Sequence, residues 1–167
     1  FTEGQTYELE LSEVALSRTD GTNALTATEV GKLVVKKSPD LNVGELKVDK
    51  QTLNPGEKVS VSWQVTNIGG LETGSGWSEQ ISLVGADGQT SSLIGTLNHN
   101  GTLAIGAVVS RQAEVELPTV IGLDGSVKLQ VKLIPGSGCG ERADAMENNV
   151  AQMDVTLGKT LYLELPQ

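Results

Sequence analysis

Glu57–Gly70, EKVSVSWQVTNIGG, is the stretch that decides the fold. Alternate residues in it are apolar, and those between them are polar. Such period-two alternation is typical of a β-strand with one buried face and one face in water. The residues predicted to face the core are Val59, Val61, Trp63 and Val65. The Asn-Ile-Gly-Gly that follows tolerates positive φ and therefore predicts the end of the strand.

Similar apolar alternation recurs at regular intervals between residues 41 and 157, separated by Gly-, Asn- and Asp-containing turns. The predicted strands are 41–48, 57–66, 77–84, 90–97, 107–117, 126–134 and 149–157. About seven short strands at this spacing predict an all-β fold, an immunoglobulin-like antiparallel β-sandwich. Further residues predicted to lie in its core are Val127, Leu129, Val131 and Val155.

The segments on either side of this domain carry strand patterns of their own. Residues 1–38 predict two or three strands, too few for an independent core, and we interpret them as the closing strands of a preceding β module. Pro39 marks the boundary, because proline cannot join a central ladder. Residues 158–165, within the C-terminal segment 158–167, echo residues 4–11. The echo is either chance, the first strand of a following module, or a strand that pairs with the N-terminal strands as a small β extension.

Composition excludes some classes of partner. The 167 residues carry a net charge of −9, which argues against binding to nucleic acid or to anionic lipid. Cys139 is the only cysteine, so no intramolecular disulfide can form. No apolar run approaches the ~20 residues that a membrane-spanning helix needs. Because the sequence opens at Phe1 without methionine, we expect a fragment of a longer chain.

Residues 39–157 resemble the CARDB domain, the cell-adhesion-related domain found in bacteria. The motifs that carry the resemblance are Pro39-Asp40-Leu41, Asn54-Pro55-Gly56-Glu57, Val65-Thr66-Asn67-Ile68-Gly69 and Glu147-Asn148-Asn149-Val150. The resemblance implies an immunoglobulin-like sandwich of an exported, multidomain bacterial or archaeal surface protein, and it carries no catalytic site. The chain departs from the family pattern in its Gly-rich loop around Cys139.

Two groups of residues are candidates for ligand binding. Trp77 is either a core residue in phase with its strand or an exposed platform on which a sugar ring could stack. Asp144, Glu147, Asn148 and Asn149 carry oxygen ligands of the type that Ca²⁺ uses, so they could hold a structural Ca²⁺ ion. The competing interpretation is that the asparagines satisfy backbone groups where the loop enters the last strand.

No enzyme motif stands out. No G-x-S-x-G nucleophile motif occurs. His99 is the only histidine and Cys139 the only cysteine, and no sequence motif links the two as a catalytic pair. We therefore predict a non-enzymatic, extracellular adhesion or spacer module without a required cofactor. Its partners would be the neighbouring domains of the same chain, with protein or glycan contacts at the cell surface. The alternatives are a carbohydrate-binding accessory module that uses Trp77 and, third, a hydrolase.

Overall fold

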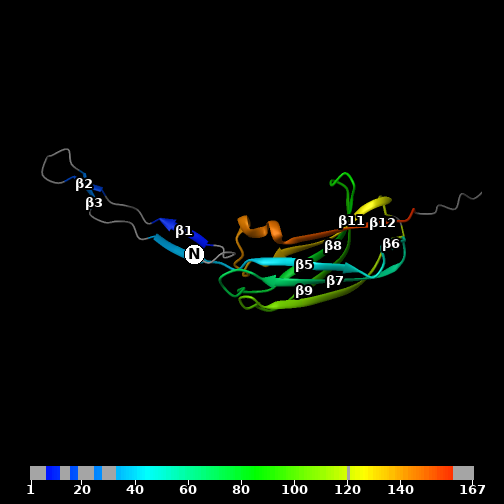
Figure 1. Ribbon diagram of the computed structural model, residues 1–167, viewed down its shortest axis with the longest axis horizontal. Coiled ribbons are helices and arrows are strands. Elements are labelled where there is room, and N and C mark those ends of the chain that lie inside the picture. Colours follow the sequence, from blue (N-terminus) through cyan, green and yellow to red (C-terminus); the bar gives the residue numbers. More distant parts are fainter. Residues whose placement is uncertain (1–6, 12–15, 19–24, 28–32, 120, 160–167) are drawn as a thin grey trace, which may run out of the picture.

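The computed structural model describes residues 7–11, 16–18, 25–27, 33–119 and 121–159. Its main body is a β-sandwich of two sheets, which confirms the predicted fold class (Figure 1). No helix in the described part of the chain is long and apolar enough to cross a membrane.

One sheet has three strands in the order β10-β7-β5, and the other has five in the order β6-β12-β11-β8-β9. All neighbours are antiparallel except β6 and β12, which run parallel. The strands of the first sheet are β5 (Leu41–Val48), β7 (Lys58–Asn67) and β10 (Val108–Glu116). Those of the second are β6 (Thr52–Leu53), β8 (Trp77–Gly85), β9 (Ser91–His99), β11 (Gly125–Pro135) and β12 (Val150–Leu157).

The core lies between the two sheets and consists mainly of aliphatic side chains. It includes the apolar alternate residues of β7, and Trp63 among them is only 1% exposed. All eight residues expected in the core are buried: Val59, Val61, Trp63, Val65, Val127, Leu129, Val131 and Val155. The alternation in the sequence therefore reflects which face of each strand turns inward.

A β-bulge interrupts β5 directly after Gly44. The register between β5 and β7 shifts between Gly44 and Lys47, and Glu45 has a φ of 52°. The extra residue changes the phase of the strand, so that Leu41 and Val43 before it and Leu46 and Val48 after it all reach the core.

The other differences from the expected elements are small. The bounds of the seven predicted strands are within two residues of those observed, and the short strand β6 was not predicted. The loop before β12 contains a short 3₁₀ helix, η1 (Ala143–Asn148).

The described residues of the N-terminal segment form four short strands, more than the two or three predicted: β1 (Tyr7–Leu11), β2 (Leu16–Arg18), β3 (Leu25–Ala27) and β4 (Leu33–Lys37). In antiparallel pairs, β1 joins β4 and β2 joins β3. The suggested pairing of residues 158–167 with this segment concerns residues 160–167, which lie outside the described part of the chain.

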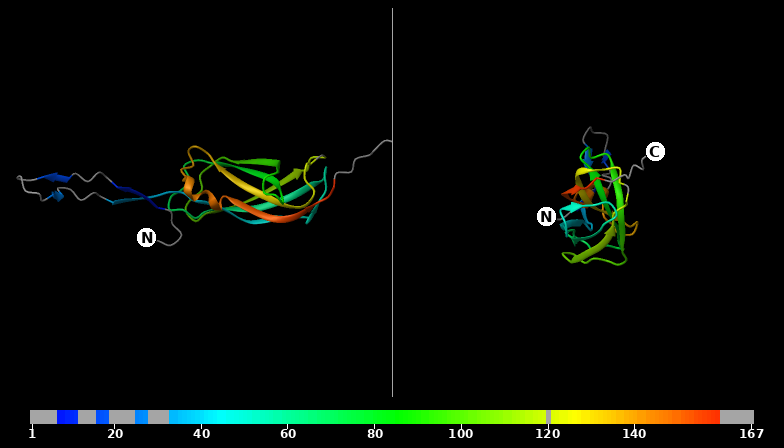
Figure 2. Two further views of the ribbon diagram at one scale, coloured as in Figure 1. Left: turned by 90° about the horizontal axis from the view of Figure 1, so that it is seen from above. Right: turned by 90° about the vertical axis from the view of Figure 1, so that its right-hand side faces the viewer.

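The long axis of the sandwich has two distinct ends. At the N-terminal pole, Leu41 begins β5 opposite Asn67. At the C-terminal pole, β12 ends at Leu157, and the Gly158 N–H donates to the Leu53 carbonyl at 2.8 Å. The chain therefore joins the sandwich at one pole and leaves it at the other (Figure 2).

Candidate functional site: the N-terminal pole

Asn67 ties three segments together at the N-terminal pole. This side chain is fully buried, and its Oδ1 accepts from the N–H groups of Asp40 and Gly69 at 3.3 and 3.0 Å. Its Nδ2 donates to the carbonyls of Leu71 and Leu103 at 2.7 and 2.9 Å. One amide thus satisfies backbone groups of the incoming chain and of two loops, which would otherwise be buried without partners.

Gly69 allows the incoming chain to pass close to the backbone of the β7–β8 loop. A Cβ at this position would lie 2.4 Å from the Asp40 nitrogen and 2.5 Å from the Ser38 oxygen. Gly70 and Ile68 donate backbone hydrogen bonds to Ser38 and Asp40 at 2.9 and 2.8 Å. The Asn-Ile-Gly motif therefore has a physical basis: it clips residues 38–40 to the pole.

A second network holds the same incoming segment from the other side. The Leu41 N–H donates to Glu141 Oε1 at 2.7 Å, and Asn149 Nδ2 donates to Glu141 Oε2 at 2.9 Å. Asn148 Nδ2 donates to Asp40 Oδ1 at 2.8 Å. Burial raises the pKa of the Glu141 carboxyl, and its hydrogen bonds with Asn149 and Leu41 oppose that shift.

The structure does not bring the four residues suggested for Ca²⁺ to one point. Asp144 is exposed and forms an ion pair with Arg142 at 2.9 Å, and Glu147 is exposed at the surface of η1. Only Asn148 and Asn149 turn inward, because η1 ends there and the chain enters β12. Asn148 therefore binds Asp40 of the incoming segment, and Asn149 binds Glu141. Neither asparagine completes a site with Asp144 and Glu147.

The described residues contain no group of three or more His, Cys, Asp and Glu side chains that could hold a metal ion. Within the second network only Asp40 and Glu141 supply carboxylates. The Oδ1 atoms of Asn148 and Asn149 are buried without a hydrogen-bond partner in the described part of the chain.

Trp77 is not an exposed platform, contrary to the interpretation that a sugar could stack on it. Its side chain is 3% exposed, because it lies at the start of β8 on the inner face. The indole Nε1 donates to Glu79 Oε1 at 3.0 Å, and the ring stacks on His99 with centroids 4.1 Å apart. Burial lowers the pKa of His99, Arg111 adds to that lowering, and Glu79 opposes it.

Behind Trp77 lies a buried ion pair that was not predicted from the sequence. Glu79 is 0% exposed, and both of its oxygens accept from Arg111 at 2.8–3.0 Å. Arg111 also donates to the Asn98 carbonyl at 3.1 Å. The signal was present in the phase of the strands: Glu79 alternates with Trp77 and Ile81, so it must face inward and needs a buried partner.

Cys139 is also buried, and burial raises the pKa of its thiol. It lies in the loop between β11 and η1, with its N–H donating to the Gly136 carbonyl at 2.9 Å. A thiol that is inaccessible and held in the protonated form is a poor nucleophile.

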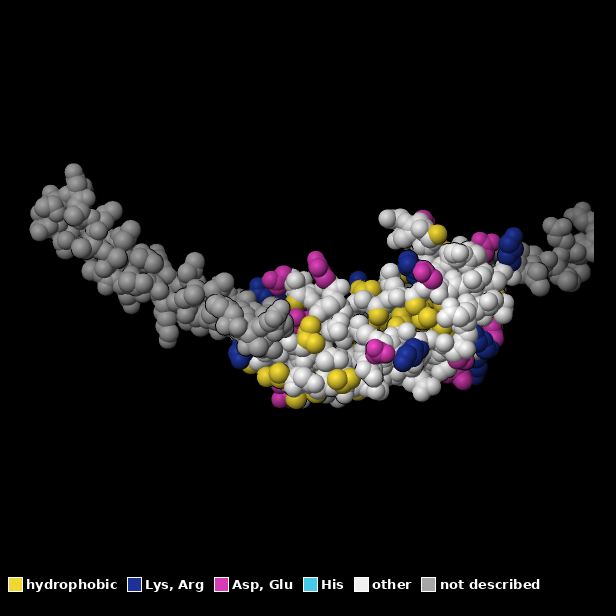
Figure 3. All heavy atoms as spheres, in the orientation of Figure 1, with side chains coloured by type: hydrophobic (Ala, Val, Ile, Leu, Met, Phe, Trp, Pro, Cys, Tyr) yellow, Lys and Arg dark blue, Asp and Glu magenta, His cyan; other side chains and the backbone are white. Residues whose placement is uncertain are grey.

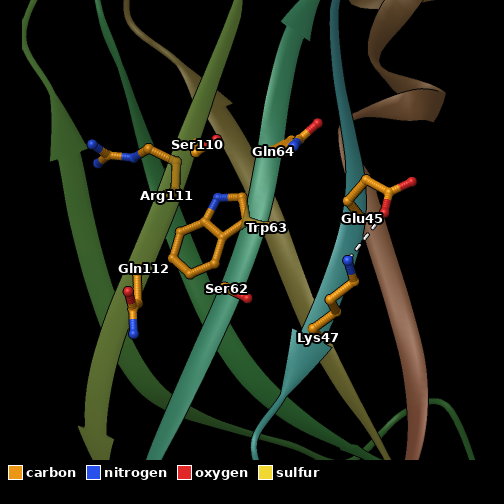
Figure 4. Close-up of a pocket in the computed structure, with 8 residues that line it drawn as sticks. All are labelled: Glu45, Lys47, Ser62, Trp63, Gln64, Ser110, Arg111 and Gln112. Atoms are coloured by element: carbon orange, nitrogen blue, oxygen red, sulfur yellow. Dashed lines mark ion pairs between the residues drawn. The ribbon is translucent and has the colours of Figure 1, made fainter.

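A separate cavity of about 300 Å³ lies against the three-stranded sheet, lined by residues of β5, β7 and β10 (Figure 4). The polar side chains along it include Gln64, Gln112 and an exposed ion pair between Glu45 and Lys47. Arg111 turns away from that pair, toward its partner Glu79. These groups therefore do not converge on one point.

Comparison of the sequence with family models and with curated proteins finds no match. Among solved structures, the crystal structure of a CARDB domain from Pyrococcus furiosus, in complex with di-metal ions, matches with a TM-score of 0.51 and 17% identity. The match covers 72% of this chain and 90% of that one. The solution structure of the same domain gives a TM-score of 0.46 and 19% identity over 73% of this chain and 97% of that one.

Part of β-glucosidase 3B from Thermotoga neapolitana is also similar, with a TM-score of 0.48 and 13% identity. This match covers 77% of the present chain but only 17% of the enzyme chain. At such identities the likeness concerns the fold alone. The crystal structure of the archaeal domain thus confirms that the chain has the fold of a CARDB domain, as its motifs predicted.

Proposed function

We propose that this chain is a non-enzymatic spacer and adhesion module of a larger, exported surface protein from a bacterium or archaeon. One observation carries the proposal: the incoming residues Ser38–Leu41 are fixed at one pole, and Gly158 is fixed at the other. Because both chain ends are hydrogen-bonded to the sandwich, it can set the distance and orientation between the modules that it joins.

The dimensions suit such a role. The ten residues of β7 run along the sandwich, and at ~3.3 Å per residue they span about 33 Å. Ser38 and Asp40 are only 6% and 7% exposed, so the segment before β5 is part of the folded body rather than a loose linker. A stiff attachment transmits the position of one module to the next.

The N-terminal pole also offers a surface for a neighbouring module. Separate hydrophobic side chains are exposed at the end of the sandwich nearest the N-terminal segment, whereas the largest hydrophobic patch on this face lies farther along the body (Figure 3). Four hydrophobic residues near Asn67 are 38–57% exposed: Ile68, Leu71, Ile105 and Val108. Ile68 follows Asn67 and Leu71 accepts a hydrogen bond from it, whereas Ile105 and Val108 adjoin Gly106 and Ala107, which hydrogen-bond to its backbone. We infer that the module preceding residue 38 packs here, because the chain delivers it to this point.

Other observations support the non-enzymatic, extracellular part of the proposal. The candidate nucleophile Cys139 is buried, and Glu79 is engaged by Arg111 and Trp77. The net charge of −9 disfavours nucleic acid and anionic lipid as partners. The CARDB fold and the motifs of the sequence favour an adhesion-related role at the cell surface.

The spacer role can be tested by measuring distances between spin labels at the two poles. Labels would be attached at Lys37→Cys and Lys159→Cys, both exposed, while Cys139 stays buried. We expect a narrow distance distribution, as narrow as that of a reference pair within the sandwich, Gln112→Cys and Gln152→Cys. A pole-to-pole distribution much broader than the reference would show that the ends are loosely attached, and it would overturn the proposal.

A further inference from the structure

A polar cavity of about 500 Å³ opens beside the buried Trp77 and has no part in the spacer role. It lies where β8 begins and β9 and β11 end. The polar residues that line it are Ser75, Ser78, Asn98, His99 and Asn100, and they are joined by Trp77, Ile134 and Pro135. The volume lies within the range of about 300–1,000 Å³ that is usual for small-molecule sites.

Close packing of backbone shapes this cavity. A Cβ on Gly76 would lie 1.7 Å from the His99 carbonyl oxygen, and one on Gly136 would lie 2.6 Å from the Gly76 oxygen. Gly136 also donates to the Gly76 carbonyl at 3.1 Å. Gly76, just before β8, and Gly136, just after β11, therefore allow the loops to approach each other closely. Because these residues have no side chains, their backbone forms part of the cavity wall.

The wall around the aromatic pair is held rigidly from behind. The Glu79–Arg111 ion pair fixes Trp77 through its indole N–H and fixes β9 through the Asn98 carbonyl. Trp77 in turn stacks on His99. A buried ion pair adds little net stability compared with apolar residues of similar size, but here it positions the residues that line the cavity.

The lining carries no formal charge. It contains no Asp, Glu, Lys or Arg side chain, and burial lowers the pKa of its one titratable group, His99, which favours the neutral imidazole. Hydroxyls, amides and a neutral imidazole can both donate and accept hydrogen bonds. Such a set suits a ligand with many hydroxyls, whereas a metal ion would need carboxylates and a phosphate would need cations.

We propose that this cavity binds a neutral saccharide of one or two rings. Asn98, Asn100 and the two serines would exchange hydrogen bonds with its hydroxyls, while His99 and Pro135 would contact its C–H faces. The proposal differs from the exposed tryptophan platform because Trp77, although it lines the cavity, is only 3% exposed, so polar side chains rather than an open indole face would make most of the ligand contacts. It is also independent of the spacer role, which rests on the two poles.

The test is an NMR titration of the whole chain, labelled with ¹⁵N, with glucose, galactose, N-acetylglucosamine and cellobiose. The single histidine gives an isolated imidazole signal within the site. We expect saturable shifts for His99 and for residues 75–78, 98–100 and 134–136 with at least one of these sugars. Galacturonate, which carries a carboxylate, should bind more weakly than galactose.

Two variants make the test specific. Asn100→Ala removes an exposed lining side chain without disturbing the core, and the loss of one or two hydrogen bonds should weaken binding about fivefold. Gln89→Ala, in the exposed hairpin between β8 and β9, should bind as the parent does. The proposal would be overturned if no sugar gave saturable shifts, if galacturonate bound best, or if Asn100→Ala bound sugar as tightly as Gln89→Ala.

Discussion

At the scale of single residues, Gly69 is a position at the N-terminal pole where neighbouring backbone leaves no room for a side chain. Its backbone passes so close to Ser38–Asp40 that a methyl group would lie 2.4–2.6 Å from three backbone atoms. Backbone cannot move aside as a flexible side chain can. The hydrogen bonds of Asn67, Ile68 and Gly70 to the incoming segment depend on this close approach.

We therefore expect Gly69→Ala to lower the free energy of unfolding by about 3 kcal/mol, since the clash forces a backbone shift. Chemical denaturation monitored by tryptophan fluorescence would measure the change. Gly122→Ala is the matched control, because Gly122 has open space around its Cβ position and no positive φ. That variant should stay within about 0.5 kcal/mol of the parent. Equal stability of the two variants would contradict the role assigned to Gly69.

At the scale of elements, the Glu79–Arg111 pair joins β8 of one sheet to β10 of the other. Arg111→Met would leave a fully buried carboxylate without its cation, and we expect a loss of about 3–5 kcal/mol. The double variant Glu79→Leu with Arg111→Met should recover most of that loss. A remaining cost of about 1 kcal/mol is expected because the Trp77 N–H loses its acceptor.

A double-mutant cycle measures the interaction energy between Glu79 and Arg111. It compares the free energies of unfolding of the parent, both single variants and the double variant. The expected result is strong coupling, in which the second substitution restores stability. Additive losses would show instead that the two side chains stabilise the sandwich separately.

The elements themselves could largely be predicted, whereas the contacts between them could not. Period-two alternation locates each strand because one face of every strand is buried, and it also places Trp63 in the core. The same phase puts Glu79 inside, but nothing in the sequence identifies Arg111, 32 residues away, as its partner. Pairing across the sandwich depends on strand order, which alternation does not reveal.

The four residues suggested for Ca²⁺ show a similar limit to predicting a binding site from the sequence. Asp144, Glu147, Asn148 and Asn149 are close in sequence, but η1 leaves the two acidic residues exposed and turns the two asparagines inward. Asn148 and Asn149 bind instead to Asp40, 108 residues from Asn148, and to Glu141. Proximity in sequence therefore suggested the ligand type but not the set of side chains that meet.

At the scale of the whole molecule, the directions of the first and last strands of the sandwich determine how it would bear force. β5 starts at the N-terminal pole, and β12, which follows the loop beside Asp40, also runs from that pole to the C-terminal one. Pulling on the two poles acts along both strands. Antiparallel hydrogen bonds are perpendicular to their strands, so such a force loads many of them at once, in shear.

Pulling from two points on one pole is mechanically different. Attachment at Lys37 and Glu147 places both handles at the N-terminal pole, so the force acts across the strands and can break the β5–β7 bonds one after another. Attachment at Lys37 and Lys159 places the handles at opposite poles. In single-molecule pulling at equal speed, we expect the pole-to-pole geometry to unfold at markedly higher force. Equal unfolding forces would mean that the sandwich is not arranged to resist tension along its axis, and the proposal of a load-bearing spacer would lose its mechanical basis.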